Sequence, residues 1–591
     1  MSTRVTIRYV NCDALAFCRT LQKQVVHDES LTGDWYRDMW TYAPLVLDAA
    51  AYAKDGSAPS TFDVIDTSNL MDHLGCLNVL TATASLIRRN VSSMIRTEML
   101  IDPERSDPAS ATTLLCGDLP TVALLLGLKP VQYWTNATPV WHLNLANSPN
   151  DYNTGLSVTD ISRPIILWKP LDTSNVHYDP FELASSLLSM HRYMFIDETC
   201  EGRVSTRGST YGLHSQAGFV SLLQCIKALN VVDWAPFIQA FLKEGLLPEG
   251  PLNTCPYNIQ SLLVHLDNLS VCKVEDYLDG WRPQQSELAR PLREWKGIPP
   301  VLNITLAIPH EKVSALAEIS RNVGTTLGQL SLDSLGGSGR SVYTNIHMGF
   351  GTVETSGVAF TNSYWLAIHE DEKGWLGVSP LIVSATVSTR SLIEHADDEC
   401  HVSFEPKATS ASIDTFVAEF GSTPEVYRSA VGRYDVFVSL YAPNSHSHVS
   451  VNGVVTSESN EGRSPPSGVL HFTNMTLASD VIATIHPIIA KDTNIVESLR
   501  VRYVIHSGGA KSSLQNGRAV SFSTPKTFSL ALNIGSDYRK DLTLPFPLDV
   551  NSGRIKIARK ALWIEYTATV KSVKDLSVCP DYMLPAHINE Q

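Results

Sequence analysis

The chain has 591 residues, of which 43% are hydrophobic and 18% are charged, and its formal net charge is -14. This length exceeds a single compact core and predicts about two to four domains, while the composition excludes general disorder. The acidic balance disfavours binding of nucleic acid, and no run of about 18 apolar residues marks a membrane span.

The first element expected is a helix over residues 12–26, where Leu15, Cys18, Leu21 and Val25 recur at helical spacing. An aromatic stretch, DWYRDMWTYAPLVL, follows it. We interpret this stretch as the end of a helix that packs on a sheet, with an aromatic binding site as the alternative.

The clearest pattern lies between residues 62 and 100. Residues 62–66 are predicted to form a buried strand, a helix is expected from Leu70 to about Ile87, and residues 93–100 are predicted to form a second strand. A strand, a helix and a strand over this length predict a β-α-β unit, whose two strands run parallel. Residues 165–168 are expected to form a further strand.

The remainder of the chain divides by pattern. Four apolar-periodic helices are predicted at 181–195, 215–230, 234–247 and 258–272, and alternating β-branched runs with glycine-rich turns begin near residue 299. We therefore predict an α/β domain over 1–175 (Rossmann-like, an incomplete parallel sheet with helices), a helical segment over 176–298 packed on it, and a β-rich, sandwich-like domain over 299–591.

The candidate site follows the first strand of the β-α-β unit. Asp66, Thr67, Ser68 and Asn69 stand where a parallel strand should end and a helix should begin. Ligands of open α/β sheets bind at this position, so these four residues are the candidate cofactor-binding set. The alternative is that Ser68 or Asn69 only caps the helix and that Asp66 pairs with neighbouring backbone.

Asp72 and His73 follow in the first turn of the same helix. The helix dipole favours a carboxylate there, and a histidine can exchange a proton near neutral pH. A solvated or capping role is the interpretation we favour for both residues.

No local motif names a reaction or a metal. Phosphate-binding glycine motifs and a nucleophile elbow are missing, and the ten cysteines include no C-x-x-C pair. His446 and His448 form an H-x-H pair without an evident third ligand, so we interpret them as part of a hairpin turn and predict no metal site. Trp365 and Trp375 are interpreted as core residues of the sandwich, with a carbohydrate or peptide site as the alternative.

Two long blocks carry a family resemblance. FDVIDTSNLMDHLGCLNVLTATASLI, with the later LLCGDLPTVALLLGLKPVQYWTNAT, is similar to a region of fungal MYND-finger proteins. The segment LPFPLDVNSGRIKIARKALWIEYTATV looks like theirs as well, so the resemblance spans most of the chain. It implies a front domain that resembles degraded nucleotide- or methyl-donor-binding α/β folds and is related to a domain of a dynein arm assembly factor.

This chain departs from the family pattern in two ways. The zinc-binding MYND finger has no counterpart, because its C-x-x-C ligands are missing. The first strand and glycine loop of a methyl-donor site also have no counterpart before Cys12, which would place the start of the chain inside the front domain and counts against S-adenosylmethionine.

These observations predict a non-catalytic protein-interaction or assembly factor that has a protein partner and no cofactor, and that binds neither nucleic acid nor membrane. The alternative is a methyltransferase-like enzyme that binds S-adenosylmethionine at Asp66 to Asn69. Scattered cysteines in apolar runs favour reduced thiols, and hence a cytoplasmic protein with the nucleus as the alternative.

Overall fold

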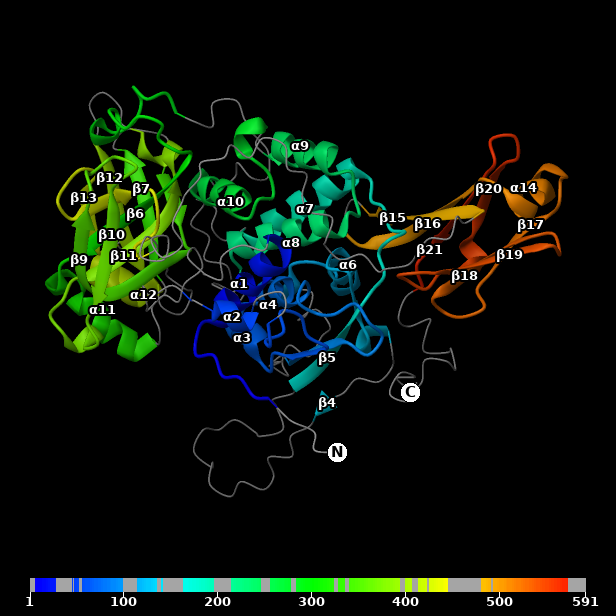
Figure 1. Cartoon of the computed structure of the whole chain (residues 1–591), viewed down its shortest axis with the longest axis horizontal. Coiled ribbons are helices and arrows are strands. Elements are labelled where there is room, and N and C mark those ends of the chain that lie inside the picture. The colour runs from blue at the N-terminus through cyan, green and yellow to red at the C-terminus, as the bar shows by residue number, and fades with distance from the viewer. Residues whose placement is uncertain are drawn as a thin grey trace, which may run out of the picture. The chain divides into compact units, whose positions relative to one another are not determined.

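The computed structural model describes seventeen stretches of the chain (Figure 1), namely residues 6–27, 45, 47–52, 56–98, 114–134, 140–141, 163–195, 214–245, 256–277, 283–323, 328–334, 340–393, 399–406, 413–421, 425–444, 480–490 and 493–571. Among the helices of these stretches, none combines the length and hydropathy that a bilayer crossing requires.

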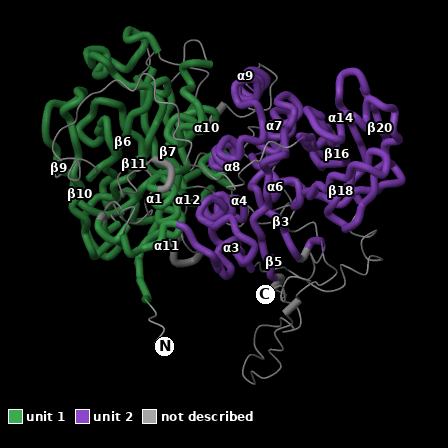
Figure 2. Tube along the Cα trace, turned by 45° about the vertical axis from the view of Figure 1, so that its right-hand side comes forward, with its two compact units in different colours: residues 1–60, 199–220, 255–467 green, residues 61–198, 221–254, 468–591 purple. Residues whose placement is uncertain are grey.

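The chain forms two compact units, each made of three separate segments (Figure 2). Unit 1 contains residues 1–60, 199–220 and 255–467, and unit 2 contains residues 61–198, 221–254 and 468–591. The front α/β region therefore folds with the last part of the chain. The three predicted domains, with boundaries near 175 and 298, stay a prediction, and the compact units divide the chain elsewhere.

Unit 2 begins with the predicted β-α-β unit. Strand β1 (Val64–Asp66) pairs in parallel with β2 (Met94–Glu98), and helices α3 (Leu70–Leu74) and α4 (Cys76–Thr83) connect them. The predicted single helix is interrupted at Gly75, whose φ of 89° is the left-handed conformation that glycine adopts at little cost.

The rest of this sheet is antiparallel. Strand β5 (Arg163–Pro170) pairs antiparallel with β2, with β3 (Leu128–Pro130) and with β4 (Val140–Trp141), which gives the order β1-β2-β5-β3. The predicted parallel arrangement thus holds for one pair of strands, and a Rossmann-like sheet is not confirmed.

Strand β1 lies at the edge of this sheet. Among the strands that the structure describes it has β2 as its one neighbour, and Val64 is 58% exposed. The prediction of a buried strand at 62–66 is therefore wrong, because a strand buried on both faces must lie between neighbours and beneath helices.

The helices predicted between residues 176 and 298 are all present. Helix α7 (Pro180–Met194) is capped by Asp179, whose carboxylate accepts the backbone N–H of Phe181 and of Glu182 at 3.0 Å. The other helices of this region and of the front are α1 (Ala14–His27), α2 (Ala49–Tyr52), α6 (Leu119–Leu125), α8 (Gln216–Leu229), α9 (Trp234–Gly245) and α10 (Pro256–Asn268).

The described residues of unit 1 form two antiparallel sheets. The first has the order β10 (Trp365–Glu370), β9 (Ile346–Ser356), β11 (Leu381–Ser388), β6 (Val301–Ile308) and β14 (Val436–Ser439). The second has the order β13 (Tyr427–Ala430), β12 (Cys400–Pro406), β7 (Gly328–Ser334) and β8 (Arg340–Tyr343).

Both sheets contribute to one hydrophobic core. Leu306 and Val383 of the first sheet belong to the same buried cluster as Leu332 and Val402 of the second, so the two sheets face each other as a sandwich. Helices α11 (His310–Val323) and α12 (Ile413–Phe420) add further apolar side chains to this cluster.

The C-terminal part of unit 2 contains two more antiparallel sheets. One has the order β15 (Val481–Ile489), β16 (Val496–Ile505), β21 (Trp563–Thr569) and β20 (Arg554–Ala558). The other has the order β17 (Val520–Ser523), β18 (Ser529–Ile534) and β19 (Tyr538–Thr543). Helix α14 (Gly508–Gln515) follows β16 and precedes β17 in the sequence.

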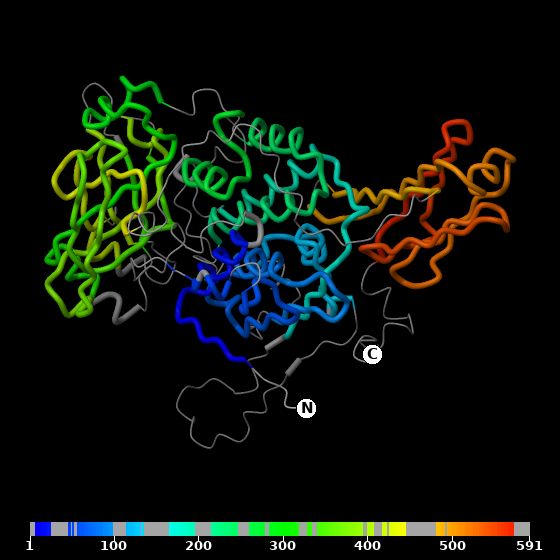
Figure 3. The backbone as a smooth tube through the Cα atoms, in the orientation of Figure 1, coloured from blue at the N-terminus to red at the C-terminus, as the bar shows by residue number. Residues whose placement is uncertain are grey.

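Contacts distant in sequence join these sheets to the front of unit 2 (Figure 3). Val176 forms a parallel bridge with Ile485 of β15, and the backbone N–H of Val496 donates to Thr121 Oγ1 at 3.2 Å. The predicted β-rich character of residues 299–591 is confirmed, but its last part packs with the front α/β region.

Candidate functional site

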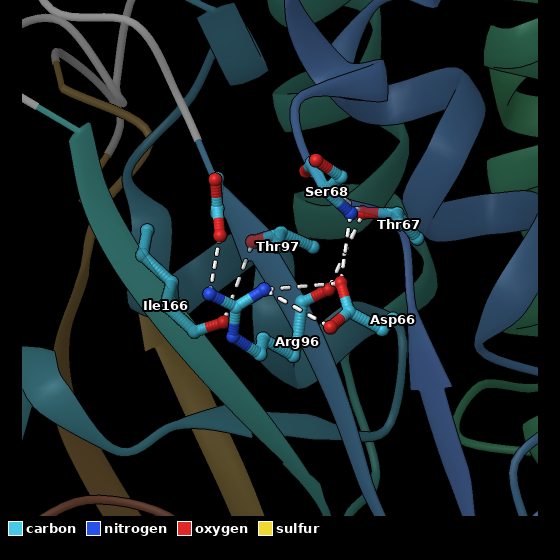
Figure 4. A network of polar contacts seen from close by, with 7 residues as sticks. Asp66, Thr67, Ser68, Arg96, Thr97 and Ile166 are labelled. Carbon is cyan, nitrogen blue, oxygen red and sulfur yellow. Dashed lines mark hydrogen bonds and ion pairs between the residues drawn. The ribbon is translucent and has the colours of Figure 1, made fainter.

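Three of the predicted cofactor-binding residues, Asp66, Thr67 and Ser68, lie together in the turn from β1 to α3 (Figure 4), and Asn69 follows them as the residue before α3. Asp66 ends β1, and α3 begins at Leu70. Ser68 has a φ of 46°, a left-handed conformation that residues other than glycine seldom adopt. Asp66 Oδ1 accepts the Ser68 N–H at 2.9 Å, which stabilises this tight turn.

An ion-pair network occupies the carboxylate of Asp66. Arg96 Nη1 on β2 lies 3.1 Å from Asp66 Oδ1 and 3.0 Å from Oδ2. The Nη2 of the same guanidinium pairs with the carboxylate of Glu98. The parallel register places Arg96 directly opposite Asp66, so strand pairing itself builds this contact. One guanidinium thus serves two carboxylates at the surface.

Backbone bonds fix the turn onto β2. The Thr67 N–H donates to the Arg96 carbonyl at 3.0 Å, and the Glu98 N–H donates to the Ser68 carbonyl at 2.9 Å. Thr67 is 5% exposed, and its Oγ1 lies 3.3 Å from the Arg96 carbonyl. Thr67 is therefore a structural residue whose hydroxyl faces the protein.

Asn69 takes the N-cap position of α3, but its side chain makes no capping hydrogen bond. Its Nδ2 lies 3.2 Å from Nε2 of His73, one turn further along the chain. The capping alternative is therefore wrong for Asn69, while the pairing of Asp66 with nearby backbone is confirmed. His73 is exposed and contacts Asn69, and Asp72 lies in the first turn of the helix.

A buried tryptophan and two hydrogen bonds connect β2, which carries Arg96, to the neighbouring strand β5. Trp168 on β5 is fully buried, and its Nε1 donates to Thr97 Oγ1 at 2.9 Å. The hydroxyl of Thr97 in turn donates to the Ile166 carbonyl at 3.4 Å (Figure 4). These two hydrogen bonds join β2 to β5 at Thr97, the residue that follows Arg96.

The sheet topology limits what this turn can bind. Dinucleotide and methyl-donor sites of open α/β sheets lie in the crevice where two neighbouring parallel strands diverge. Here β1 is an edge strand, and the strand beyond β2 runs antiparallel. The Asp66 side chain is 52% exposed, so the network is a surface feature that could hold a cationic or hydroxyl group.

A second polar group was missed by sequence reasoning. Lys129 on β3 lies with its Nζ 3.1 Å from the ring centroid of Phe528, and burial lowers the pKa of Lys129 to about 7. The ring of Trp134 lies 5.7 Å from that of Phe528 and 5.6 Å from that of Phe546. We call these four residues the Lys129 cluster.

The Lys129 cluster left one local signal in the sequence. A lysine interrupts the apolar run LLLGLKPV, which is unusual because lysine is seldom buried. Its partners Phe528 and Phe546 lie about four hundred residues further along the chain, so no local pattern could assign them.

The remaining predicted residues are placed as follows. Trp375 packs against Phe350 at 4.8 Å beside the sandwich core, as the core interpretation predicts, and Trp365 is half-buried in β10. His446 and His448, and most of the aromatic stretch 34–47, lie outside the described residues.

The cysteines in the described stretches are free thiols. Burial raises the pKa of Cys18 to about 11 and that of Cys116 to about 12, so these thiols are unreactive near neutral pH. Within the same stretches no three histidine, cysteine or acidic side chains gather as a metal site.

No protein-family model, curated protein or solved structure matches the chain.

Proposed function

We propose that this chain is a non-catalytic protein that binds a protein partner, in the manner of an interaction or assembly factor. Three features motivate this proposal: the missing catalytic motifs in the sequence, the large β-rich half, and the resemblance to a family associated with a protein-binding finger, which itself has no counterpart in this chain. We place the protein in the cytoplasm, with the nucleus as the alternative.

One observation carries the proposal against the enzymatic alternative. Both oxygens of Asp66 are bonded to Arg96, and Oδ1 also accepts the Ser68 amide. A ligand at this turn would have to replace those bonds or compete with them. The same residues are well suited to holding a turn in one conformation.

A surface at one end of the unit 1 sandwich supports partner binding. Leu376, Val378 and Tyr434 are 86%, 88% and 82% exposed, and we call these three residues the sandwich tip. Val378 lies just before β11, and Tyr434 lies just before β14. Both strands pair antiparallel with β6, which lies between them, so both begin at the end of the sheet where β6 ends. The two loops are therefore about 10 Å apart, two strand spacings, at the same end of the sheet.

Exposed apolar side chains that cluster in this way are typical of protein-binding surfaces. Scattered single residues would need no explanation, but these three large side chains are each more than 80% exposed at the same end of one sheet, and we infer that they form one apolar patch. An aromatic residue within such a patch is a frequent centre of binding energy.

The test is recovery of a partner from the native cell with a tagged full chain. A stoichiometric protein should co-purify, and the triple variant Leu376→Ser, Val378→Ser, Tyr434→Ser should recover less of it. Val358→Ser is the matched control, because Val358 is 66% exposed in the hairpin at the other end of β10. Recovery of the chain alone at several salt concentrations would contradict the proposal.

The alternative function is a methyltransferase-like enzyme on a Rossmann-like front domain, and the β-α-β unit with polar residues at its strand end favours it. Calorimetric titration with S-adenosylmethionine separates the two functions. Saturable heat that Asp66→Asn abolishes would establish the enzymatic alternative. We expect no heat and no thermal shift at millimolar ligand, since binding would have to stabilise the folded state.

A further inference from the structure

Strand β20 in unit 2 is an edge strand with both faces open. It pairs with β21 and has no second neighbour among the strands that the structure describes. Its residues from Arg554 to Ile557 are all exposed. An edge strand presents a row of unpaired N–H and C=O groups, which another extended chain can pair with.

The two faces of β20 differ in chemistry. Arg554 and Lys556 point to one face, while Ile555 and Ile557, which are 42% and 39% exposed, point to the other. A chain that paired with this edge would meet cations at every second residue and isoleucine at the residues between them.

The cationic face continues into the sheet. Arg554 of β20 pairs with Thr567 of β21, which pairs in turn with Arg500 of β16. In the same way, Lys556 pairs with Glu565, and Glu565 pairs with Arg502. Residues aligned across antiparallel strands share a face, so four cations lie on one face of β16, β21 and β20.

Glu565 lies on this face, 3.3 Å from Lys556 Nζ, and a second carboxylate, the exposed Glu497, lies at the register shift near the start of β16. Arg502 lies 4.8 Å from the ring centroid of Trp563. The face therefore carries an excess of positive charge on a chain whose formal net charge is -14. A positively charged face on an otherwise acidic protein attracts negatively charged groups, so we expect the partner segment to be acidic.

We propose that β20 accepts an extended acidic segment of a protein partner as an added strand, with carboxylates opposite Arg554 and Lys556 and apolar side chains beside Ile555 and Ile557. The inference rests on the proposed protein-binding function and names the partner's chemistry. A strand edge bonds through backbone amides, which a polypeptide supplies and a nucleic acid does not, so the open edge favours a peptide.

A second copy of the chain fits this edge less well. An antiparallel pair of β20 strands would bring Arg554 and Lys556 of one copy against the same cations of the other. Like charges directly opposite each other destabilise a sheet. The occupant is therefore a chain of opposite charge.

The test uses the full chain and labelled peptides of about eight residues in fluorescence anisotropy. An alternating Glu-Val peptide should bind, and the double variant Arg554→Glu, Lys556→Glu should weaken it at least tenfold. An alternating Lys-Val peptide should bind this variant better than it binds the wild type. Rescue by swapped charge cannot come from misfolding, because a misfolded edge would bind neither peptide.

The matched control is Arg539→Glu, Lys540→Glu on β19, the edge strand of the neighbouring sheet, which should leave affinity for the Glu-Val peptide unchanged. A peptide with the same residues in two blocks should bind more weakly, since only alternation fits both faces of β20. Hydrogen exchange should show new protection of backbone amides at 554–558 when the Glu-Val peptide is added.

Several results would overturn the inference: equal binding by the wild type and the β20 variant, preference for the block peptide or a single-stranded oligonucleotide, or unchanged exchange at 554–558. A cellular partner recovered equally by the β20 variant would overturn it and leave the proposed function standing. Peptide binding at β20 with no cellular partner would contradict the proposed function alone.

Discussion

Replacement of Lys129 by methionine should stabilise the protein at neutral pH. Methionine has a similar length and fills the same space against Phe528 without a charge. Burial lowers the pKa of Lys129 from 10.5 to about 7, and the strand pairing also sets it opposite Lys169. A partly buried ammonium that forms no ion pair with the residues that the structure describes is a cost that the folded state carries.

The size of the effect follows from the pKa. Each unit of difference between the folded and unfolded states corresponds to about 1.36 kcal/mol, so the upper bound for Lys129 is about 4–5 kcal/mol. Part of the side chain remains in water, and the face of an aromatic ring favours a cation by about 1–2 kcal/mol. We therefore expect Lys129→Met to raise the free energy of unfolding by about 2 kcal/mol at pH 6–7.

The difference in bound protons between the folded and unfolded states determines how the stability changes with pH. Below about pH 7 Lys129 is protonated in both states, so the folded state bears the full cost of the buried charge. Between about 7 and 10.5 the unfolded chain holds a proton that the folded chain has lost, so stability of the wild type rises with pH. The advantage of the variant should therefore shrink as pH rises and be nearly gone near pH 10.

Scanning calorimetry of the full chain at several pH values measures this advantage. At about 2.1 cal/mol/K of unfolding entropy per residue, and with about 300 residues in unit 2, a gain of about 2 kcal/mol corresponds to a rise of about 3 °C in melting temperature. Lys560→Met is the control, because Lys560 is exposed in the turn between β20 and β21 and its removal should give no gain at pH 7. A lower melting temperature for Lys129→Met at pH 7, or an equal shift at pH 7 and 10, would refute the reasoning.

Three further substitutions probe the fold and the candidate site. Trp168→Phe removes the 2.9 Å hydrogen bond to Thr97 and should cost about 1–3 kcal/mol of unfolding free energy in chemical denaturation. Asp66→Asn breaks a surface ion pair and should cost less than about 1 kcal/mol, and a larger loss would mean that the turn is more tightly coupled to the core. Gly351→Ala would place a Cβ 2.3 Å from the His369 carbonyl oxygen, so it should destabilise unit 1 by about 1–3 kcal/mol, and an unchanged melting temperature would contradict this packing.

Local patterns predicted the elements of the front region but not their arrangement. Hydrophobic spacing and polar residues at strand ends were enough to predict the β-α-β unit of residues 62–100 and its parallel strands. The edge position of β1 and the antiparallel direction of β5 depend on pairings between distant segments, which periodicity does not report. The break at Gly75 had a visible signal, a glycine within the helical pattern.

In the β-rich half, too, local patterns predicted the strands but not how they are arranged. Alternation correctly predicted strands such as β6, β11, β16 and β21. It could not predict that β15 joins the front region through the bridge between Val176 and Ile485, because more than three hundred residues separate the two segments. Long-range pairing of this kind also brings Phe528 to Lys129.

The candidate site was predicted in part. The four residues from Asp66 to Asn69 do lie in one turn, as their consecutive positions require. The partner that occupies Asp66 was missed, although Arg96 follows from the parallel pairing once its register is known. The polar residues could be identified from the sequence, but the bond between Asp66 and Arg96 depends on the register of the two strands.

Native mass spectrometry of the tagged full chain from its own cell tests the central claim most directly. A non-catalytic interaction protein should appear as a complex whose mass exceeds that of the chain by a second polypeptide. A mass equal to the chain alone, or to a whole multiple of it, would contradict that account.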